Sequence, residues 1–451
     1  MADSFAASSG LPVWTGWLLG YGLFTWWIVG ALPSSLGPDL DVATMAMVIA
    51  GMQVRESRNL SIKLYLMLGA ALAVGYFCKS IMFPMAFVFL GVSILRDWSR
   101  ANAARILVAA AVFVVIAGPW VTLLSRAKGH VTFAESGGLA FAWSNYNIPV
   151  FHYQGSTKGG KVLHPTRQIY ADPPVFEFDG PIRASYPPWY DPSYWNAGLA
   201  PRFDFFVVAR HVLKNITAEL KIYFRPVAWV TGMVLLLACC RPNLTLAALR
   251  SYWYLLIPVL AVSGAYALTF SEFRYFPGWS IVLWGAVIAS LRMRNHLGHS
   301  FALNGAMVLV VLAMVSAVAY GAYGQAVHGN QYDGSSEYLT AEGLLKLGLH
   351  RGDKVASIGF DVDAHWAYLA GLNIVADIPT TGACEFWQAP ETVRADILER
   401  LAGHGVRAVV ANGGGGMQSS LRGNNIASCT RPDSNWQKLA GVANYARFLT
   451  K

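Results

Sequence analysis

A succession of nine long apolar runs constrains the fold of this chain more than any other sequence feature. Most runs approach the roughly 20 residues that an α-helix needs to cross about 30 Å of hydrocarbon. The runs lie at 11–32, 36–54, 64–78, 80–95, 104–124, 226–240, 252–270, 275–291 and 302–322. Only 13% of all residues are charged, whereas a soluble domain carries about 25%. The sequence therefore predicts an α-helical polytopic membrane protein with about nine transmembrane helices.

Two of these runs adjoin, so this part of the chain forms either one long helix or two short helices. Residues 64–95 are nearly continuous, but Lys79 and Pro84 interrupt them. One straight helix of this length would be about 48 Å long, which exceeds one crossing. A Lys at its centre would cost about 3 kcal/mol. Two short helices, with Lys79 at the turn between them, are the better prediction.

Basic residues indicate the orientation of the predicted helices. Alternating the sides of the membrane gives one side Arg55, Arg58, Lys63, Arg96, Arg100, Arg105, Arg241, Arg250, Arg292 and Arg294. The short loops of the other side receive only Lys79 and Arg274. Because cytoplasmic loops are enriched in Lys and Arg, we expect a cell (inner) membrane protein with a cytoplasmic N-terminus. The formal charge of +9 is explained by this topology, and no basic stripe suggests a nucleic-acid partner.

The N-terminus and the long loops complete the predicted organisation. The run at 11–32 follows a segment without Lys or Arg, so we interpret it as a span and not as a cleaved signal peptide. The predicted parts are N-terminal helices at 1–124, a long extracytoplasmic loop at 125–225, C-terminal helices at 226–322 and an extracytoplasmic α/β domain at 330–451. Residues 203–224 of the loop predict an amphipathic helix in the membrane interface.

The C-terminal domain shows alternating strand and helix patterns. The predicted strands are 354–359, 374–377 and 406–411, and the predicted helices are 363–370 and 391–403. The run Gly413–Gly416 follows a strand, but no P-loop Lys follows it, so a mobile turn is favoured over a phosphate cradle.

The cysteines and acidic residues give no clear metal centre. Cys78, Cys239 and Cys240 lie in or beside apolar runs and suggest packing residues, whereas Cys384 and Cys429 could form a disulfide. Four acidic residues of the long loop sit near Pro and are interpreted as turn formers more readily than as a cation site. They are Asp172, Glu177, Asp179 and Asp191. No metal ligands are assigned, and a divalent cation stays a possible cofactor.

Three charged groups fall on the predicted outer side, where burial of charge is costly and indicates function. Asp39, with Asp41 nearby, opens the second apolar run and could act as a base or simply begin a helix. Lys79 could neutralise a phosphate or extend to the membrane interface. Arg274 could bind a phosphate through two hydrogen bonds or pair internally with Glu272.

In this order, these motifs resemble the GT-C integral membrane glycosyltransferases. The resemblance covers residues 11–322 and is nearest to bacterial relatives of the protein mannosyltransferase and lipid A aminoarabinose transferase group. It implies a polyprenyl-phosphate-linked sugar donor and a glycan, lipid or protein acceptor on the outer face. It also assigns a second acidic position to Asp39, the donor phosphate to Lys79, Arg274 and Tyr275, and a supporting role to Glu272.

The sequence departs from this family in one segment. The principal catalytic acid of the family lies in a first outer loop, and no segment of this chain matches that loop. A truncated chain without activity is therefore one expectation. The alternatives are a non-catalytic membrane scaffold or partner subunit, and a lipid-linked oligosaccharide ligase or polymerase. A transporter is disfavoured because the runs hold few charges away from their outer ends.

Overall fold

The structure is a computed structural model, and it divides into two compact units that are described separately. It describes residues 18–25, 27, 38–56, 61–134, 136–145, 166–178, 185–187, 203–224, 227–292, 301–328, 335–360, 363–413 and 426–449. The first unit holds residues 1–145 and 203–328, and the second holds 146–202 and 329–451. The chain is mostly helical, with one small sheet in the second unit.

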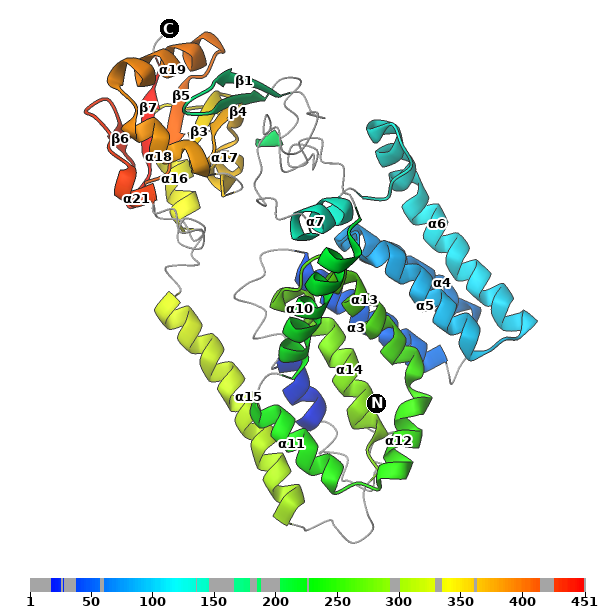
Figure 1. The fold of residues 1–451 in the computed structure, drawn as a ribbon. Helices are drawn as coiled ribbons and strands as arrows, with labels where there is room; N and C mark the ends of the chain where they lie inside the picture. The colour runs from blue at the N-terminus through cyan, green and yellow to red at the C-terminus, as the bar shows by residue number, and fades with distance from the viewer. Residues whose placement is uncertain are drawn as a thin grey trace. The chain divides into compact units, whose positions relative to one another are not determined.

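The first unit consists of helices (Figure 1). Their bounds are α3 (Asp39–Glu56), α4 (Ile62–Cys78), α5 (Met82–Arg96), α6 (Arg100–Lys128), α7 (Ser136–Asn145), α10 (Phe205–Tyr223), α11 (Val227–Ala238), α12 (Pro242–Ser251), α13 (Trp253–Leu268), the 3₁₀ turn η2 (Phe273–Tyr275), α14 (Pro277–Ser290) and α15 (Phe301–His328). The predicted apolar runs from 36–54 onward each coincide with one of these helices. The first run, 11–32, lies largely outside the described residues.

Few of these helices are long enough to cross a membrane alone. Among the described residues only α6 is both long and apolar enough, and two sharply bent pairs, α10 with α11 and α12 with α13, raise the number to three if each pair is one span. Helices α4, α5 and α14 have 17, 15 and 14 residues and are apolar but short. Such helices reach about 21–26 Å, less than the 30 Å of a typical hydrocarbon layer. The nine predicted crossings therefore stay a prediction.

The chain does break into two helices at Lys79, as predicted. Lys79 has extended backbone angles (φ −159°, ψ 139°) and ends α4, while its N–H still donates to the Gly75 carbonyl at 3.1 Å. Helix α5 then starts at Met82, and Pro84 falls in its first turn, where a missing N–H costs nothing. This break places the Lys79 ammonium at a helix end instead of inside an apolar helix.

Two glycines let helices of this unit approach closely. A Cβ on Gly278 of α14 would lie 2.6 Å from the Cα of Ala43 on α3. A Cβ on Gly69 of α4 would lie 2.2 Å from the carbonyl oxygen of Ala109 on α6. Small residues at such contacts are the usual way in which apolar helices pack tightly. The contact at Gly278 holds α3 against the start of α14, and both segments border the charged group described below.

The second unit is an α/β domain, as predicted. Its seven-stranded sheet has the order β1-β2-β4-β3-β5-β7-β6, in which β4, β3 and β5 are parallel. The strands are β1 (Thr166–Tyr170), β2 (Val175–Phe178), β3 (Lys354–Ile358), β4 (Asn373–Ile378), β5 (Ala408–Ala411), β6 (Gln437–Lys438) and β7 (Tyr445–Phe448). The helices are α16 (Ser335–Lys346), α17 (His365–Ala370), α18 (Thr380–Gln388), α19 (Glu391–Gly403) and α21 (Ile426–Cys429). Each predicted strand and helix of this domain is confirmed to within two residues at its ends.

The second unit also contains a hairpin from the long loop and the disulfide that the sequence had left open. The β1–β2 hairpin comes from the long loop 125–225, yet β2 pairs antiparallel with β4 of the C-terminal domain. The long loop is thus divided, since α7 and α10 belong to the first unit. Cys384 of α18 and Cys429 of α21 form a disulfide with a Cα–Cα distance of 5.3 Å. Most of the glycine run lies outside the described residues.

Candidate functional site

Asp39 is the first charged residue of the candidate site and begins helix α3. The amide of Val42 donates to the Pro38 carbonyl at 3.0 Å, which sets the first turn immediately before Asp39. A carboxylate is favoured in the first turn of a helix because the free N–H groups make that end positive. The Asp39 side chain is only 5% exposed, so its charge needs partners within the protein.

Lys79 supplies the nearest partner. Its Nζ lies 2.5 Å from Asp39 Oδ1, across 40 residues of sequence. The Lys79 side chain is a quarter exposed. Burial lowers the pKa of Lys79, and the hydrogen bond to Asp39 acts in the opposite direction. The helix break at Lys79 is thus what allows the ammonium to reach the start of α3.

The hairpin between α13 and α14 supplies the third charged group. Tyr275 N donates to the Glu272 carbonyl at 3.0 Å, which closes the 3₁₀ turn η2. Arg274 Nε lies 2.6 Å from Glu272 Oε2 and 3.5 Å from Asp39 Oδ2. Asp39 therefore stands between two cations, Lys79 at one carboxylate oxygen and Arg274 at the other.

Tyr275 packs against both cations of this group. Lys79 Nζ lies 3.8 Å from the centre of the Tyr275 ring, and Arg274 Cζ lies 5.2 Å from it. The Tyr266 ring stacks on Tyr275 with a centroid separation of 4.8 Å. Tyr275 thus offers its ring face to Lys79 and its hydroxyl oxygen to Arg274 Nη2 at 3.3 Å.

A cavity of about 640 Å³ lies beside this cluster. Lys79 and Tyr275 are part of its wall, together with Tyr266, Ser80 and residues of helix α7. Asp39, Glu272 and Arg274 are not among the described residues that line it. The wall is otherwise largely apolar, and the volume falls in the range of small-molecule pockets. The cavity thus presents one ammonium and aromatic faces to a ligand, with the carboxylate and guanidinium behind them.

The structure therefore brings together all five residues that the sequence singled out. They are Asp39, Lys79, Glu272, Arg274 and Tyr275. Asp41 carries neither an ion pair nor a hydrogen bond among the contacts of the described residues, and it stands in the first turn of α3. The contacts establish proximity, while the assigned roles in donor binding and catalysis stay predictions.

A polar stripe on α10 was missed in the sequence. His211 Nε2 lies 2.8 Å from the Thr269 carbonyl, and Asn215 Nδ2 donates to the Ala267 carbonyl at 3.0 Å. Glu219, a buried carboxylate, accepts a hydrogen bond of 2.7 Å from Ser271 Oγ, directly before the hairpin. The i, i+4, i+8 spacing of these residues on an amphipathic helix was the available signal. The stripe holds the end of α13 and the start of the Glu272–Tyr275 hairpin.

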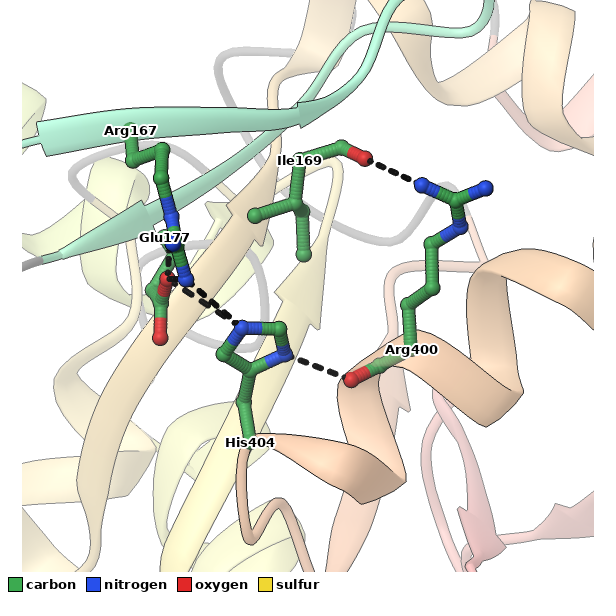
Figure 2. Close-up of polar contacts among 5 residues, drawn as sticks. All are labelled: Arg167, Ile169, Glu177, Arg400 and His404. Carbon is green, nitrogen blue, oxygen red and sulfur yellow. Dashed lines mark hydrogen bonds and ion pairs between the residues drawn. The ribbon is translucent and has the colours of Figure 1, made fainter.

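Glu177, one of the acidic residues of the long loop, belongs to a group of polar contacts in the second unit. Figure 2 shows Glu177 of β2 beside Arg167 of β1 and His404 at the end of α19. Arg167 donates to Glu177 at 2.7 Å and lies 2.8 Å from His404 Nε2, while His404 Nδ1 lies 2.6 Å from the Arg400 carbonyl. These contacts attach the β1–β2 hairpin to α19. Among the described residues no group of three His, Cys, Asp or Glu could hold a metal ion, and Asp179 and Asp191 lie outside them.

Comparisons with protein-family models, with curated proteins and with solved structures returned no match for this chain.

Proposed function

We propose that this protein is a membrane glycosyltransferase that takes a sugar from a polyprenyl-phosphate-linked donor and transfers it to an acceptor on the extracytoplasmic face. The proposal rests on one observation: Lys79 and Arg274 both form ion pairs with Asp39 next to a cavity of about 640 Å³. Two cations and an aromatic platform beside an apolar cavity match the chemistry of a lipid phosphate that bears a sugar.

Exposed apolar side chains support a membrane location for the first unit. Helix α6 exposes large side chains along its length, and these are Leu107, Val114, Val115, Trp120 and Leu123, each at least half exposed. Soluble proteins rarely leave an apolar patch of this extent in contact with water. On helix α10, which was predicted to lie in the interface, Phe205, Phe206 and Leu213 are exposed while Asn215 and Glu219 are buried. This distribution fits helices whose outer surfaces contact lipid.

Charge balance explains how the site could accept a phosphate. In the structure the two cations, Lys79 and Arg274, face two carboxylates, Asp39 and Glu272, so the group is neutral. The Glu272 side chain is 44% exposed, whereas the Asp39 side chain is 5% exposed. An arriving phosphate would replace Glu272 at Arg274, because the exposed carboxylate is the easier one to return to water. Asp39 would remain to hold both cations in position.

The proposed reaction is a substitution at the anomeric carbon of the sugar. The acceptor oxygen forms a bond to that carbon, the carbon–oxygen bond to the phosphate breaks, and the electron pair stays on the phosphate. The acceptor proton passes to solvent water, because both carboxylates of the cluster are paired with cations. Lys79 and Arg274 would stabilise the negative charge that develops on the leaving phosphate, which is the electrostatic contribution that usually dominates.

The test replaces Arg274 with Ala and compares transfer with protein abundance. We expect transfer from a lipid-linked donor to fall by about 10²–10³-fold, as when one charge-stabilising donor is removed, while the amount of membrane-inserted protein stays unchanged. The matched control is Arg250→Ala, which removes another helix-end Arg outside the cluster. An equal loss of transfer and abundance in Arg274→Ala would show a purely structural role.

The neutral ion network also favours a second candidate, a non-catalytic membrane scaffold or partner subunit. Each cation of the network already has a carboxylate partner, so the contacts could serve packing alone. The two functions differ in whether the protein binds a polyprenyl phosphate. A scaffold would show no affinity for a polyprenyl phosphate, whereas the transferase should bind it and lose that binding in Lys79→Met.

A further inference from the structure

A second cavity of the first unit is separate from the Lys79 cavity. It measures about 770 Å³ and lies between residues 20–24, helix α3, helix α13 and helix α14. Arg55 is the one charged residue among the described residues that line it. The other wall residues are apolar or glycine, so the cavity suits an apolar chain and not a sugar or a nucleotide.

Glycines from three segments keep this cavity open. A Cβ on Gly20, Gly51 or Gly285 would meet no atom within 4 Å, and all three residues line the cavity. Gly278, four residues before Val282 of the cavity wall, behaves differently, because it packs directly against Ala43. Inside a helix a glycine costs roughly 1 kcal/mol relative to alanine. No side chain from these three positions therefore occupies the cavity.

Arg55 places a positive charge at this cavity. It stands in the last turn of α3 and is exposed. Among the described residues, no carboxylate forms an ion pair with it. The neighbouring Glu56 is turned inward, where its two oxygens accept hydrogen bonds from Tyr65 at 2.6 Å and Ser93 at 3.0 Å. The Arg55 guanidinium is thus available to an anion at the mouth of an apolar cavity.

The position of Arg55 separates this cavity from the proposed transfer site. Asp39 and Arg55 lie 16 residues apart on one helix, which corresponds to about 24 Å. If Asp39 is at the extracytoplasmic end of α3, Arg55 is near the cytoplasmic surface of the membrane. Anionic lipids interact with basic residues at that surface.

We propose that this cavity binds one acyl chain of an anionic phospholipid, with Arg55 holding the lipid phosphate. The apolar wall accepts the chain, and the guanidinium matches the phosphate in charge and in geometry. The inference rests on the membrane location proposed above, and it does not depend on sugar transfer. It assigns the first unit a structural lipid at the end of α3 opposite the Lys79 cluster.

Native mass spectrometry of the full-length chain in detergent micelles tests this proposal. Delipidated protein is titrated with phosphatidylglycerol or with phosphatidylcholine. We expect one phosphatidylglycerol per chain, bound at least about tenfold more tightly than phosphatidylcholine, because phosphatidylglycerol has a net negative charge, whereas the choline ammonium of phosphatidylcholine offsets the charge of its phosphate. Arg55→Gln should abolish this preference. Gly51→Leu and Gly285→Leu should each lower the affinity for both lipids about tenfold or more, because the added side chain fills the cavity.

Matched controls separate a specific site from general effects. Arg250→Gln removes an exposed helix-end Arg, and Gly91→Leu adds a side chain at a helical glycine with free space around it that does not line this cavity. Both controls should bind lipid like the wild type. An unchanged lipid preference in Arg55→Gln, or unchanged binding in both glycine variants, would overturn the proposal.

The same preparation distinguishes this inference from the proposed transferase. Lys79→Met should abolish transfer and retain the phosphatidylglycerol. A wild-type chain that binds phosphatidylglycerol but transfers no sugar would therefore refute only the transferase. A chain that alkaline carbonate extracts from membranes would refute the membrane location, and the lipid site with it.

Discussion

At the scale of single residues, the Asp39–Lys79 pair is the feature on which the candidate site depends. Asp39 is buried and Lys79 only a quarter exposed, so neither side chain can turn freely to water. Removing one partner of such a pair leaves the other charge without compensation, and this usually costs more than the pair contributes. Arg274 at 3.5 Å gives Asp39 a second, weaker partner.

This arrangement predicts strong coupling between the two residues. Asp39→Asn and Lys79→Met should each lower the free energy of unfolding, whereas the double variant should lose less than their sum. We expect an interaction energy of about 1–3 kcal/mol, because substitutions within one ion-pair network do not have additive effects on the free energy of unfolding. The measurement is unfolding in detergent by titration with a denaturing surfactant. Additive effects of the two substitutions would contradict the contact.

A second prediction at this scale concerns pH and the second unit. Burial raises the pKa of Glu337 on α16 to about 7, although the Trp366 amide donates to its carboxylate at 2.7 Å. The unfolded residue releases its proton near pH 4.5, so between that pH and 7 the folded state binds more protons. Stability contributed by this residue should be greatest below pH 4.5 and decrease as pH rises to 7, by about 3 kcal/mol in total.

Hydrogen exchange in α16 and α17 of the full-length chain measures this effect. Protection factors, corrected for the intrinsic pH dependence of exchange, should be higher at pH 5 than at pH 8. Glu337→Gln keeps a hydrogen-bond acceptor without the charge, so its protection should change little with pH. A wild-type chain as insensitive to pH as Glu337→Gln would contradict the prediction.

At the scale of helices and strands, close packing of α3 on α14 sets the position of Asp39 relative to the hairpin. Gly278 lies four residues after Arg274, and a Cβ there would approach the Ala43 backbone to 2.6 Å. Since backbone atoms cannot move aside as a flexible side chain can, any larger residue must separate the two helices.

Gly278→Ala should therefore destabilise the first unit by about 1–3 kcal/mol, the usual cost of overpacking a tight contact. It should also lower transfer, because Asp39 and Arg274 move apart. The control is Gly264→Ala on α13, where an added Cβ meets no atom within 4 Å. Equal stability of the two variants would show that the close approach of α3 and α14 is not required.

The elements also show which parts of the fold the sequence could predict. The break at Lys79 was predictable because Lys79 and Pro84 both interrupt the apolar run. The other helices follow directly from hydropathy. The pairing of β2 with β4 was not, because Val175–Phe178 and Asn373–Ile378 are about 200 residues apart and neither short strand specifies a partner. Long-range pairing depends on tertiary packing, which leaves no local pattern.

At the scale of the whole molecule, the sequence could identify the five candidate residues but not the contacts between them. The sequence placed Asp39, Lys79 and the Glu272–Tyr275 hairpin on one side of a membrane from the alternation of basic loops. It could not show that Asp39 holds both cations, or that Glu219 on α10 supports the hairpin through Ser271. Those contacts join segments between 40 and more than 200 residues apart, and only the packed helices bring them together.

The central claim is that this cluster faces the extracytoplasmic medium at the membrane surface, and cysteine labelling tests it most directly. Ser80→Cys and Glu272→Cys are introduced singly after Cys78, Cys239 and Cys240 have been replaced by Ala, and intact cells are treated with a membrane-impermeant maleimide. We predict that both positions react in intact cells, whereas Ser251→Cys at the end of α12 reacts only after the membrane is permeabilised. Reaction of Ser80→Cys and Glu272→Cys from opposite sides, or of both only after permeabilisation, would contradict the account.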